Sequence, residues 1–331
     1  MNDSEILHLI ATENADEIES LFARACEVRE AHYGKSIYFR GLIEFTNYCK
    51  NDCYYCGIRR SNAKLERYRL SLDDITDCCR AGAKLGYKTF VLQGGEDPFF
   101  TDTRIAEIVS AIRGEFPDCA ITLSAGERSR QAYELFFRAG ANRYLLRHET
   151  ATESHYAQLH PPCMNLASRM LCLRDLKEIG YQVGAGCMVG SPYQTPEHLL
   201  ADLRFMETFR PHMAGIGPFL PQKDTPFGME PGGTVQLSLK MIALTRLLLP
   251  QALIPATTAL GSITPNGREL ALQAGANIIM PNLTPLTART LYAIYDHKLN
   301  AGDDALEYQR YLEAMVRGIG LVPDLSRGDA C

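Results

Sequence analysis

Hydrophobic residues along this chain follow two patterns that alternate from one end to the other. Short apolar runs predict buried strands, and apolar residues spaced every three or four positions predict helices with one buried face. The strand patterns lie at residues 42–46, 89–93, 120–124, 143–148, 182–189, 213–219, 254–260 and 277–280. The helix patterns between them lie near residues 73–85, 102–114, 129–139, 166–179, 196–208, 236–249 and 266–273.

Eight strands that alternate with helices predict one parallel sheet, because each helix returns the chain to the edge where the next strand begins. We therefore expect an α/β fold, with a complete (β/α)8 TIM barrel over residues 36–295. An open, doubly wound sheet is the alternative. A helical extension is expected at residues 1–35, and the segment 296–331 has a short helix near 304–317.

Residues that cap helices support these boundaries. Ser71 precedes acidic residues at a predicted helix start, where they meet free N–H groups and the positive end of the helix dipole. Thr195 is a cap followed by proline, which suits the first helical position. Gly140, Gly180 and Gly275 each follow a predicted helix, where a left-handed residue ends the last turn.

The composition is that of an ordinary globular protein, with 46% hydrophobic and 22% charged residues among 331. A net charge of −5 without any basic run indicates neither nucleic acid nor an anionic membrane as a partner. The acidic, polar start is no signal peptide, and no apolar stretch is long enough to span a membrane. An odd number of cysteines, 11, favours reduced thiols and a cytoplasmic location.

Cys49, Cys53 and Cys56 form a short loop directly after the first predicted strand. Their spacing lets three thiolates converge on one inorganic centre, but three ligands are one short of a closed zinc site or a fully protein-ligated [4Fe–4S] cluster. We interpret the site as a [4Fe–4S] cluster whose fourth iron is open to a substrate or cofactor. A zinc site is the alternative; it would need a fourth ligand, and the nearest histidine, His32, lies before the strand.

Polar residues gather where the other predicted strands end. In a (β/α)8 barrel, the loops after the carboxyl ends of the strands build the active site. The polar ends are residues 93–97, 124–127, 147–150, 188–191, 257–258 and 281–284. Together they predict a pocket that is lined from most sides of the barrel.

Two of these strand ends have residue types with a specific chemical use. The glycines at residues 94–95 would let backbone groups approach a ligand beside Glu96; a tight turn with positive φ is the alternative. Alternation along the fourth strand puts Arg147 and Glu149 on the inner face and His148 outside the barrel. Arg147 suits a carboxylate and Glu149 a pair of hydroxyls, unless the two simply pair with each other.

Other candidates also have simpler explanations. Arg169 opens a predicted helix, where it could reach a carboxylate or remain a solvated side chain. Thr257 and Thr258 supply hydroxyls near the end of the seventh strand, although β-branched residues also favour strands. The cysteines outside the loop, except Cys331, are expected to be small inert hydrophobes: Cys26, Cys78, Cys79, Cys119, Cys163, Cys172 and Cys187.

The cysteine loop, with Tyr55 before its last cysteine, resembles the cluster loop of radical S-adenosylmethionine (SAM) enzymes, and residues 94–96 resemble their GGE motif. The likeness covers about residues 36–295 and points to the HydE family, the radical SAM maturases of [FeFe]-hydrogenase within the biotin synthase-like group. The segments that show it are residues 47–60, 92–98, 144–150, 184–190, 215–219, 254–259 and 279–282. The first two are shared widely among radical SAM enzymes, and the later ones are more specific to HydE.

This resemblance implies a role for each candidate residue. Cys49, Cys53 and Cys56 hold the cluster and, with Arg147, form the catalytic set. For SAM, Tyr55 and Met188 lie by the adenine, Gly94, Gly95 and Glu96 bind the amino group, Arg169 the carboxylate, and Ser124 and Glu149 the ribose. Arg147, Thr257, Thr258 and Tyr292 line a deeper cavity and hold a cysteine-like carboxylate.

The resemblance also implies an enzyme that reductively cleaves SAM and processes an iron–cysteine species with CO and cyanide ligands during assembly of the hydrogenase H-cluster. It implies an electron donor such as ferredoxin or flavodoxin, and other maturation proteins as partners. Many HydE chains have three further cysteines near the C-terminus for a second cluster. Residues 296–330 contain none, and Cys331 alone cannot hold a cluster, so no auxiliary cluster is expected.

Two other functions remain open at this point. Another biotin synthase-like radical SAM reaction, such as the amino-acid rearrangement of methylornithine synthase, would use the same cluster loop with a different substrate cavity. A non-enzymatic scaffold with a structural zinc or cluster would have no use for residues 94–96 or for an Arg–Glu pair inside a barrel.

Overall fold

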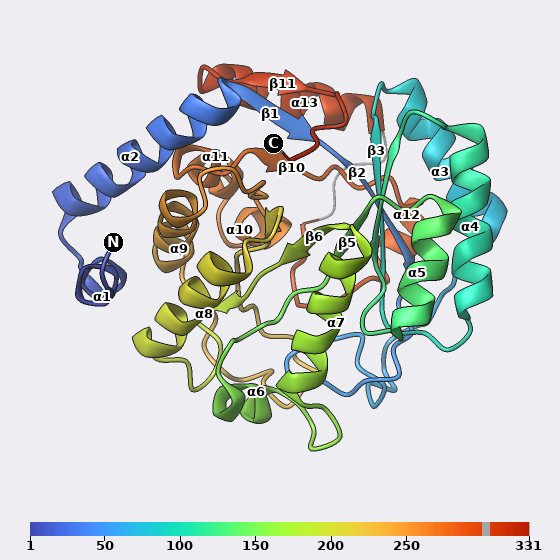
Figure 1. The fold of residues 1–331 in the computed structure, drawn as a ribbon, viewed down its shortest axis with the longest axis horizontal. Coiled ribbons are helices and arrows are strands. Elements are labelled where there is room, and N and C mark those ends of the chain that lie inside the picture. Colours follow the sequence, from blue (N-terminus) through green and yellow to red (C-terminus); the bar gives the residue numbers. More distant parts are fainter. Residues whose placement is uncertain (300–304, 331) are drawn as a thin grey trace.

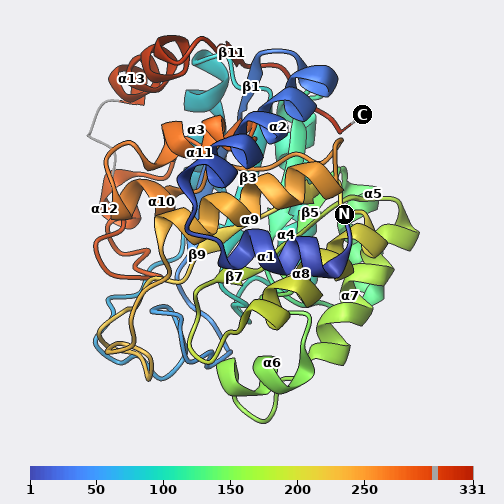
Figure 2. The same cartoon turned by 90° about the vertical axis from the view of Figure 1, so that its left-hand side faces the viewer.

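Parallel strands close into a ring in the computed structural model of this chain, which describes residues 1–299 and 305–330 (Figures 1 and 2). The first part of the ring is a parallel sheet in the order β2 (Gly41–Thr46), β3 (Thr89–Gly94), β4 (Ala120–Ser124), β5 (Arg143–Leu145), β6 (Gln182–Ala185) and β8 (Met213–Ala214). Residues 253–255 occupy the seventh position, through bridges to β8 and to β10 (Ile278–Ile279). A bridge from Asn282 to Leu42 closes the ring, so the predicted TIM barrel is confirmed.

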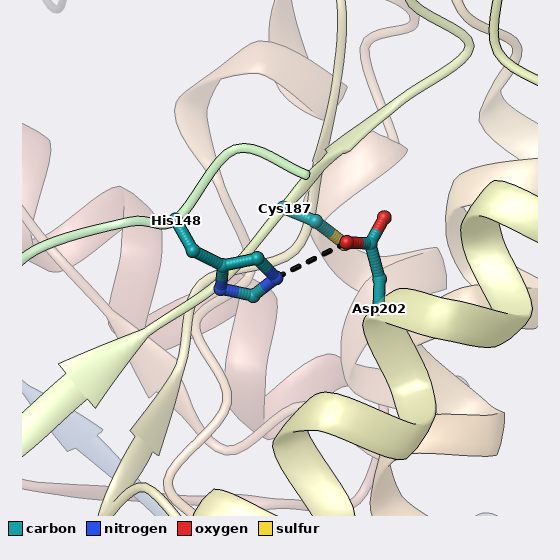
Figure 3. A group of neighbouring side chains, drawn as sticks. All are labelled: His148, Cys187 and Asp202. Atoms are coloured by element: carbon teal, nitrogen blue, oxygen red, sulfur yellow. Dashed lines mark ion pairs between the residues drawn. The ribbon is translucent and has the colours of Figure 1, made fainter. Parts of the chain in front are cut away.

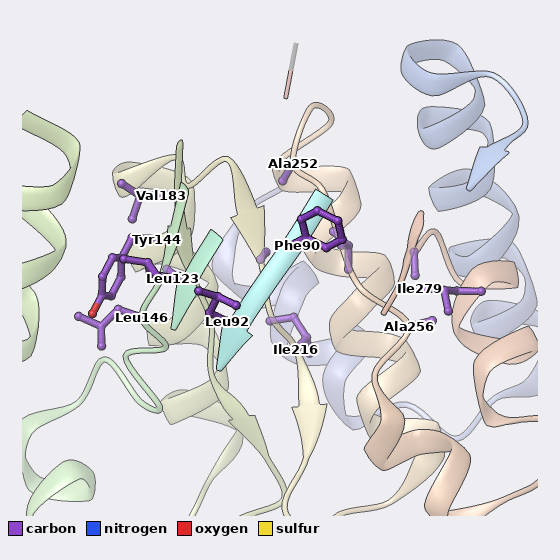
Figure 4. Packing of buried hydrophobic residues seen from close by; sticks show 14 of the residues in the cluster. Phe90, Leu92, Leu123, Tyr144, Leu146, Val183, Ile216, Ala252, Ala256 and Ile279 are labelled. Atoms are coloured by element: carbon purple, nitrogen blue, oxygen red, sulfur yellow. The ribbon is translucent and has the colours of Figure 1, made fainter. Parts of the chain in front are cut away.

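Helices surround the ring on its outside (Figure 1). They are α3 (Leu72–Lys84), α4 (Asp102–Glu115), α5 (Arg130–Ala139), α7 (Leu166–Ile179), α8 (Pro196–Phe209), α9 (Val235–Leu248) and α11 (Gly267–Gln273). Phe90 and Leu92 of β3 belong to the buried cluster that joins the strands to these helices (Figure 4). Thr89 and Gln93 lie on the other face with the buried Val91 between them, and they contact Arg143 and Tyr292 from other parts of the barrel.

The predicted capping residues lie where helices begin and end. Ser71 and Asp74 exchange hydrogen bonds at the start of α3, and Pro196 is the first residue of α8. The glycines that follow α5, α7 and α11 have φ angles of 115°, 106° and 103°. Only glycine adopts such angles without strain, so these residues turn each helix toward the next strand.

Several predicted strands are shorter than expected or interrupted. β5 ends at Leu145, the fifth predicted strand is split into β6 and β7 (Met188–Val189), and the sixth into β8 and β9 (Gly217–Pro218). Gly186 lies at the first break with a φ of 154°, and a Cβ there would be 2.1 Å from the carbonyl oxygen of Gly215. The strands bend at this point because their backbones approach closely. Residues 258–260, predicted as strand, instead begin α10 (Thr258–Ile263).

The expected N-terminal helical extension consists of two helices, α1 (Asp3–Ala11) and α2 (Ala15–Tyr33). The Asn14 side chain accepts hydrogen bonds from the amides of residues 16 and 17, which starts a second helix. Four further elements have no counterpart in the sequence prediction: β1 (Ser36–Phe39), α6 (Glu153–Leu159), α12 (Leu286–Arg289) and β11 (Val322–Asp324).

Residues 305–330 lie at the end of the barrel where the strands begin (Figure 1). There α13 (Ala305–Gly318) precedes β11, and β11 pairs in parallel with β1. Cys331 lies outside the described residues. The division of the chain at residues 35 and 295 remains a proposal. Within residues 1–299 and 305–330, no helix has the length and apolar character needed to cross a membrane.

Candidate active site

Hydrogen bonds from two side chains to backbone carbonyl groups shape the loop that holds the three cysteines. The Asn47 amide group donates to the carbonyl oxygens of Glu66 and Leu291, each at 2.8 Å. The Arg67 guanidinium donates to the carbonyl oxygens of Asn47, Ile58, Arg59 and Asn62. The two side chains thereby fix both ends of the loop. Sequence reasoning missed both residues, because the bonds reach backbone groups that no motif identifies.

The thiols of Cys49, Cys53 and Cys56 share one partly buried region of this loop. Burial raises the pKa of all three; charge on Cys49 also raises the pKa of the other two, and that of Cys56 reaches about 12. Their sulfur atoms are nevertheless too widely spaced for one metal ion, because the only ligand trio within 4.8 Å among the described residues lies elsewhere. The spacing therefore fits a cluster with several irons better than the alternative zinc site.

Residues 94–96 pack directly against the cysteine loop. Neither glycine has a positive φ, so the alternative explanation by a left-handed turn is wrong. A Cβ on Gly95 would be 2.2 Å from the carbonyl oxygen of Tyr48 and 2.8 Å from Cβ of Cys49. The Lys50 amide donates to the carbonyl oxygen of Glu96 at 2.9 Å. Glycine is needed here because the loop that follows β3 touches the loop that follows β2.

Tyr55 and Met188, predicted to lie near each other, belong to one apolar cluster with Leu159. The Tyr55 hydroxyl is 3.1 Å from Nε2 of His160, just beyond α6. Because Nδ1 of His160 lies 2.9 Å from the carbonyl oxygen of Tyr156, that nitrogen has the proton and Nε2 accepts from Tyr55. Helix α6, absent from the sequence prediction, thus orients the predicted adenine-binding tyrosine.

Arg147 and Glu149 form an ion pair of 3.2 Å, which was the alternative to separate contacts with ligands. His148 points to the other side. The physical reason differs from simple alternation, because β5 has already ended and Glu149 has a φ of 67°. The Glu149 carboxylate raises the pKa of Tyr55 and Cys56, after the larger effect of burial. The pair therefore lies within electrostatic reach of the cysteine loop.

Arg169 is buried and joined to Glu127, which the sequence analysis placed only at a strand end. Nε of Arg169 donates to Glu127 at 2.6 Å, and another guanidinium nitrogen donates to the carbonyl oxygen of Arg147 at 2.7 Å. The Glu127 amide donates to the Glu96 carboxylate at 2.8 Å. Ser124, at the end of β4, is in register with residue 93 at the end of β3. These contacts bring the predicted SAM-binding residues to one rim.

The remaining predicted residues follow the seventh and eighth positions of the ring. Thr257 is the residue just before α10 and makes no capping hydrogen bond with its side chain, and Thr258 is the first residue of that helix. The Tyr292 hydroxyl accepts from Gln93 at 3.3 Å. A Cβ on Gly217 would be 3.2 Å from Oγ1 of Thr257, so this hydroxyl lies against β9. Beside Tyr292, a buried ion pair joins Lys298 to Glu44. This pair was missed because its members are 254 positions apart.

Two buried polar atoms on these residues have no partner among the described residues, Nε of Arg147 and Oγ1 of Thr257. Oε2 of Glu149 makes no hydrogen bond either, but it lies 3.2 Å from Arg147 in their ion pair. Buried polar groups normally have partners, and those without one indicate a site for a ligand, ion or water. Arg147 packs near Gly215 and Thr257 near Gly217, so the two donors lie along the same short segment.

Known proteins are similar to this chain over most of its length. The radical SAM superfamily model matches residues 43–206. The chain is 48% identical over 281 residues to the [FeFe]-hydrogenase maturase subunit HydE of Thermotoga maritima, which covers 85% of this chain and 80% of the relative. It is 31% identical over 318 residues to 3-methylornithine synthase of Methanosarcina acetivorans, which covers 95% and 89%.

Solved structures show the same fold. A crystal structure of methylornithine synthase superposes with a TM-score of 0.85 and 28% identity, covering 98% of this chain and 94% of that one. The HydG maturase of Carboxydothermus hydrogenoformans superposes with a TM-score of 0.81 and 23% identity, covering 98% and 76%. At that identity the second match supports the fold alone.

Proposed function

Because this chain belongs to the HydE family of radical SAM enzymes, we propose that it acts in the maturation of [FeFe]-hydrogenase. A [4Fe–4S] cluster and SAM are the cofactors that this superfamily implies. In the proposed reaction, SAM is cleaved reductively, and an iron–cysteine species with CO and cyanide ligands is processed toward the H-cluster. The unpartnered Nε of Arg147 and Oγ1 of Thr257 are the observation in this chain that best supports a bound substrate beside the cofactors.

Cys49, Cys53 and Cys56 are the proposed cluster ligands, and no second cluster is proposed. When bound, the cluster supplies the electron that cleaves SAM. The chain contributes three free thiols on a loop whose backbone is fixed at both ends. Because burial keeps these thiols protonated, iron binding must release their protons.

The proposed SAM site lies on the rim beside this loop. Gly94, Gly95 and Glu96 bind the amino group of SAM, Arg169 its carboxylate, Ser124 and Glu149 its ribose, and Tyr55 and Met188 its adenine. The hydrogen bond that Arg169 donates to Glu127 supports this role, because it orients the guanidinium and leaves further N–H groups for an anion. Tyr55 is held in place by His160 in the same way.

The proposed substrate site is deeper in the barrel. Arg147 binds the cysteine carboxylate through its planar fork, and Thr257, Thr258 and Tyr292 complete the site. The pair with Glu149 neutralises part of the Arg147 charge without using Nε, which remains free for an anionic substrate. An electron donor such as ferredoxin or flavodoxin, other maturation proteins and a cytoplasmic location complete the proposal.

This function is tested by anaerobic reconstitution of the cluster, followed by reaction with a synthetic iron–cysteine complex that has CO and cyanide ligands (the iron–cysteine synthon). We expect about four iron and four sulfide per chain, reductive SAM cleavage, and a new organometallic species in infrared and electron paramagnetic resonance (EPR) spectra. Cys331→Ser should leave the iron count unchanged. A reproducible count near six or eight would instead indicate an auxiliary cluster. A wild-type protein that cleaves SAM but leaves the synthon unchanged would exclude the maturase reaction.

Replacing Arg147 by Lys tests the proposed substrate site. Lysine keeps the charge but loses the planar fork, so the affinity for cysteine-derived ligands should fall about tenfold or more, a loss of about 1–3 kcal/mol. Cluster content and SAM affinity should stay at the wild-type level. The measurement is equilibrium binding of a cysteine analogue with SAM present. If Arg147→Lys lost SAM binding but bound the cysteine analogue normally, Arg147 would belong to the SAM site and not to the substrate site.

An amino-acid rearrangement is the second candidate, because methylornithine synthase covers nearly the whole chain in sequence and in fold. Both functions would show cluster assembly and SAM cleavage, so neither property distinguishes them. Incubation with free amino acids, followed by mass spectrometry and NMR of the products, separates the two. An isomerised amino acid without any reaction of the iron–cysteine synthon would favour rearrangement.

A further inference from the structure

Behind the Arg147–Glu149 pair lies a cluster of three buried side chains, His148, Cys187 and Asp202 (Figure 3). His148 follows β5, Cys187 lies between β6 and β7, and Asp202 is in the middle of α8. All three are completely buried, and their ligand-type atoms lie within 4.8 Å of one another. The proposed reaction uses none of them, although buried ionisable groups require partners.

The hydrogen bonding of His148 argues against a metal ion at this cluster. Nδ1 of His148 accepts a hydrogen bond from the Gly186 amide at 3.2 Å. A neutral imidazole has one proton, so that proton is on Nε2, the nitrogen that faces Asp202. A protonated nitrogen cannot bind a metal. The N–H at Nε2 of His148 therefore faces Asp202, and the nitrogen lies 3.2 Å from Oδ1 in an ion-pair contact without hydrogen-bond geometry.

The Asp202 carboxylate receives groups from two loops at once. Oδ1 accepts the amide of Ala151 at 2.5 Å, in addition to its contact with His148. Cys187 lies beside the same carboxylate (Figure 3). Burial and then Asp202 raise the pKa of this thiol well above its usual value, so it stays protonated and can donate. One anion on α8 thus holds the loops that follow β5 and β6.

These two loops determine the position of Glu149 and Arg147. His148 and Ala151 flank Glu149, whose φ of 67° is costly for a residue other than glycine. The Glu149 amide donates to Gly186 at 3.1 Å, and the Met188 amide donates to Glu149 at 3.0 Å. Such a strained backbone persists only when its surroundings hold it.

Arg147 depends on the same structure. Its guanidinium donates to the carbonyl oxygen of Cys187 at 2.6 Å. The Cys187 backbone also forms a parallel bridge with Glu149. A shift of Cys187 away from Asp202 would therefore move an acceptor of Arg147 and the bridge partner of Glu149 together.

We infer that Asp202 is a positioning residue of the active site. From outside the barrel, its carboxylate holds His148, Ala151 and Cys187 so that Glu149 keeps its left-handed backbone and Arg147 points inward. The inference rests on the proposed function, in which Glu149 binds SAM and Arg147 binds substrate. It adds a helix residue that touches neither ligand.

Asp202→Asn tests this role with little change in volume. The single oxygen of an amide can still face Ala151 and His148, which both approach Oδ1, but the amide is neutral and its NH2 group cannot accept from the Cys187 thiol. We expect turnover to fall about 100-fold, with a weaker effect of SAM on the EPR signal of the reduced cluster. Iron content should match the wild type. Asp175→Asn, at an ion pair elsewhere on the helical layer, is the matched control and should leave all readouts unchanged.

Paired variants separate positioning from general destabilisation. Cys187→Ser and His148→Gln keep a donor toward Asp202 and should retain most activity; Cys187→Ala and His148→Leu remove it and should lose activity as Asp202→Asn does. Equal melting temperatures within each pair would exclude a simple folding defect. Equal activities within both pairs would overturn the inference. A wild-type protein that contains one zinc per chain, with that zinc lost in Asp202→Asn, would also overturn it.

Hydrogen exchange distinguishes failure of this inference from failure of the proposed function. Amides of residues 147–151 should exchange faster in Asp202→Asn, and this measurement requires neither SAM nor substrate. If these amides exchange faster in Asp202→Asn but the wild type does not react with the synthon, the positioning role is retained and the maturase reaction is excluded. Unchanged exchange together with unchanged turnover in Asp202→Asn would overturn the positioning role alone.

Discussion

Individual residues at the open end of the barrel are constrained by space as well as by chemistry. Gly95 shows this, because the cysteine loop occupies the volume that any side chain at that position would need. His160 shows the second constraint, because its buried ring must stay neutral to accept a hydrogen bond from Tyr55. Each residue leads to a prediction that requires no knowledge of the substrate.

Gly95→Ala should prevent normal cluster assembly. The added Cβ would meet the carbonyl oxygen of Tyr48 at 2.2 Å and Cβ of Cys49 at 2.8 Å, so the loop must shift. We expect iron content after reconstitution to fall severalfold, with the circular dichroism of the barrel retained. Gly114→Ala is the control, because nothing lies within 4 Å of its Cβ, and alanine should stabilise α4 by about 1 kcal/mol. Full iron loading of Gly95→Ala would contradict this explanation.

His160 should make the stability of the apoprotein depend on pH. Burial lowers the pKa of His160 from 6.5 to about 4. Between these values the unfolded imidazole binds a proton that the folded one excludes. The contribution to the free energy of unfolding is therefore complete above pH 6.5 and falls by about 3 kcal/mol as the pH approaches 4. Urea unfolding at several pH values measures it, and His160→Gln should have a shallower slope; identical slopes would exclude this role.

Contacts between elements decide how the N-terminal helices are attached to the barrel. Helix α1 leaves its last carbonyl groups without partners inside the helix, as every helix does. The buried Lys240 of α9 donates to two of them, at Ile10 and Thr12. This ammonium group therefore acts as a C-terminal cap supplied by another helix, and its charge also suits the negative end of the α1 dipole.

Lys240→Met should loosen α1 while leaving the barrel folded. Methionine fills similar space but donates no hydrogen bond, so two buried carbonyl groups lose their partner. We expect the free energy of unfolding to fall by about 1–3 kcal/mol and the α1 amides to exchange faster. Hydrogen exchange with mass spectrometry measures both effects. Lys84→Met, at an exposed position on α3, is the control, and equal exchange of α1 in the two variants would exclude the proposed cap.

At the scale of the whole molecule, the two ends of the barrel are built differently. The end where the strands finish holds the candidate active site, whereas the other end is closed by residues 325–330. There the buried Arg40 donates to the carbonyl oxygen of Gly328 at 2.9 Å. Arg143 donates to the carbonyl oxygen of Arg327 at 2.8 Å and to Asp329 at 2.6 Å. The tail thus supplies the acceptors for two cations buried among the strands.

Deletion of the chain from residue 325 should destabilise the whole barrel. Arg40 and Arg143 would lose the acceptors named above, and buried charges without partners cost about 3–5 kcal/mol. Asp329→Asn removes only one acceptor, from a carboxylate that is 39% exposed, so about 1 kcal/mol is expected. Urea unfolding of both variants measures the difference. Equal stability of the truncated and full-length chains would show that water replaces the tail.

The sequence alone determined the repeating architecture and the chemical character of the site. Apolar periodicity, caps and the glycines after helices are local properties, so they predicted most helices and the eight strand positions. The cluster loop and the positions of Arg147 and Glu149 at a strand end could be predicted because the residues of each group are close in sequence. The strand breaks and α10 were missed, because backbone approach at Gly186 depends on a distant strand.

Only the tertiary structure decided which distant groups complete the site. Ring closure brings Lys298 to Glu44, Asp202 to Ala151, and the tail to Arg143. No pattern in the sequence identifies these pairs, because a buried polar group can be satisfied by any segment that the fold brings near it. The chemistry of the cysteine loop is thus determined by residues that are close in the sequence, whereas the geometry that orients Arg147 and Glu149 exists only after the barrel has closed.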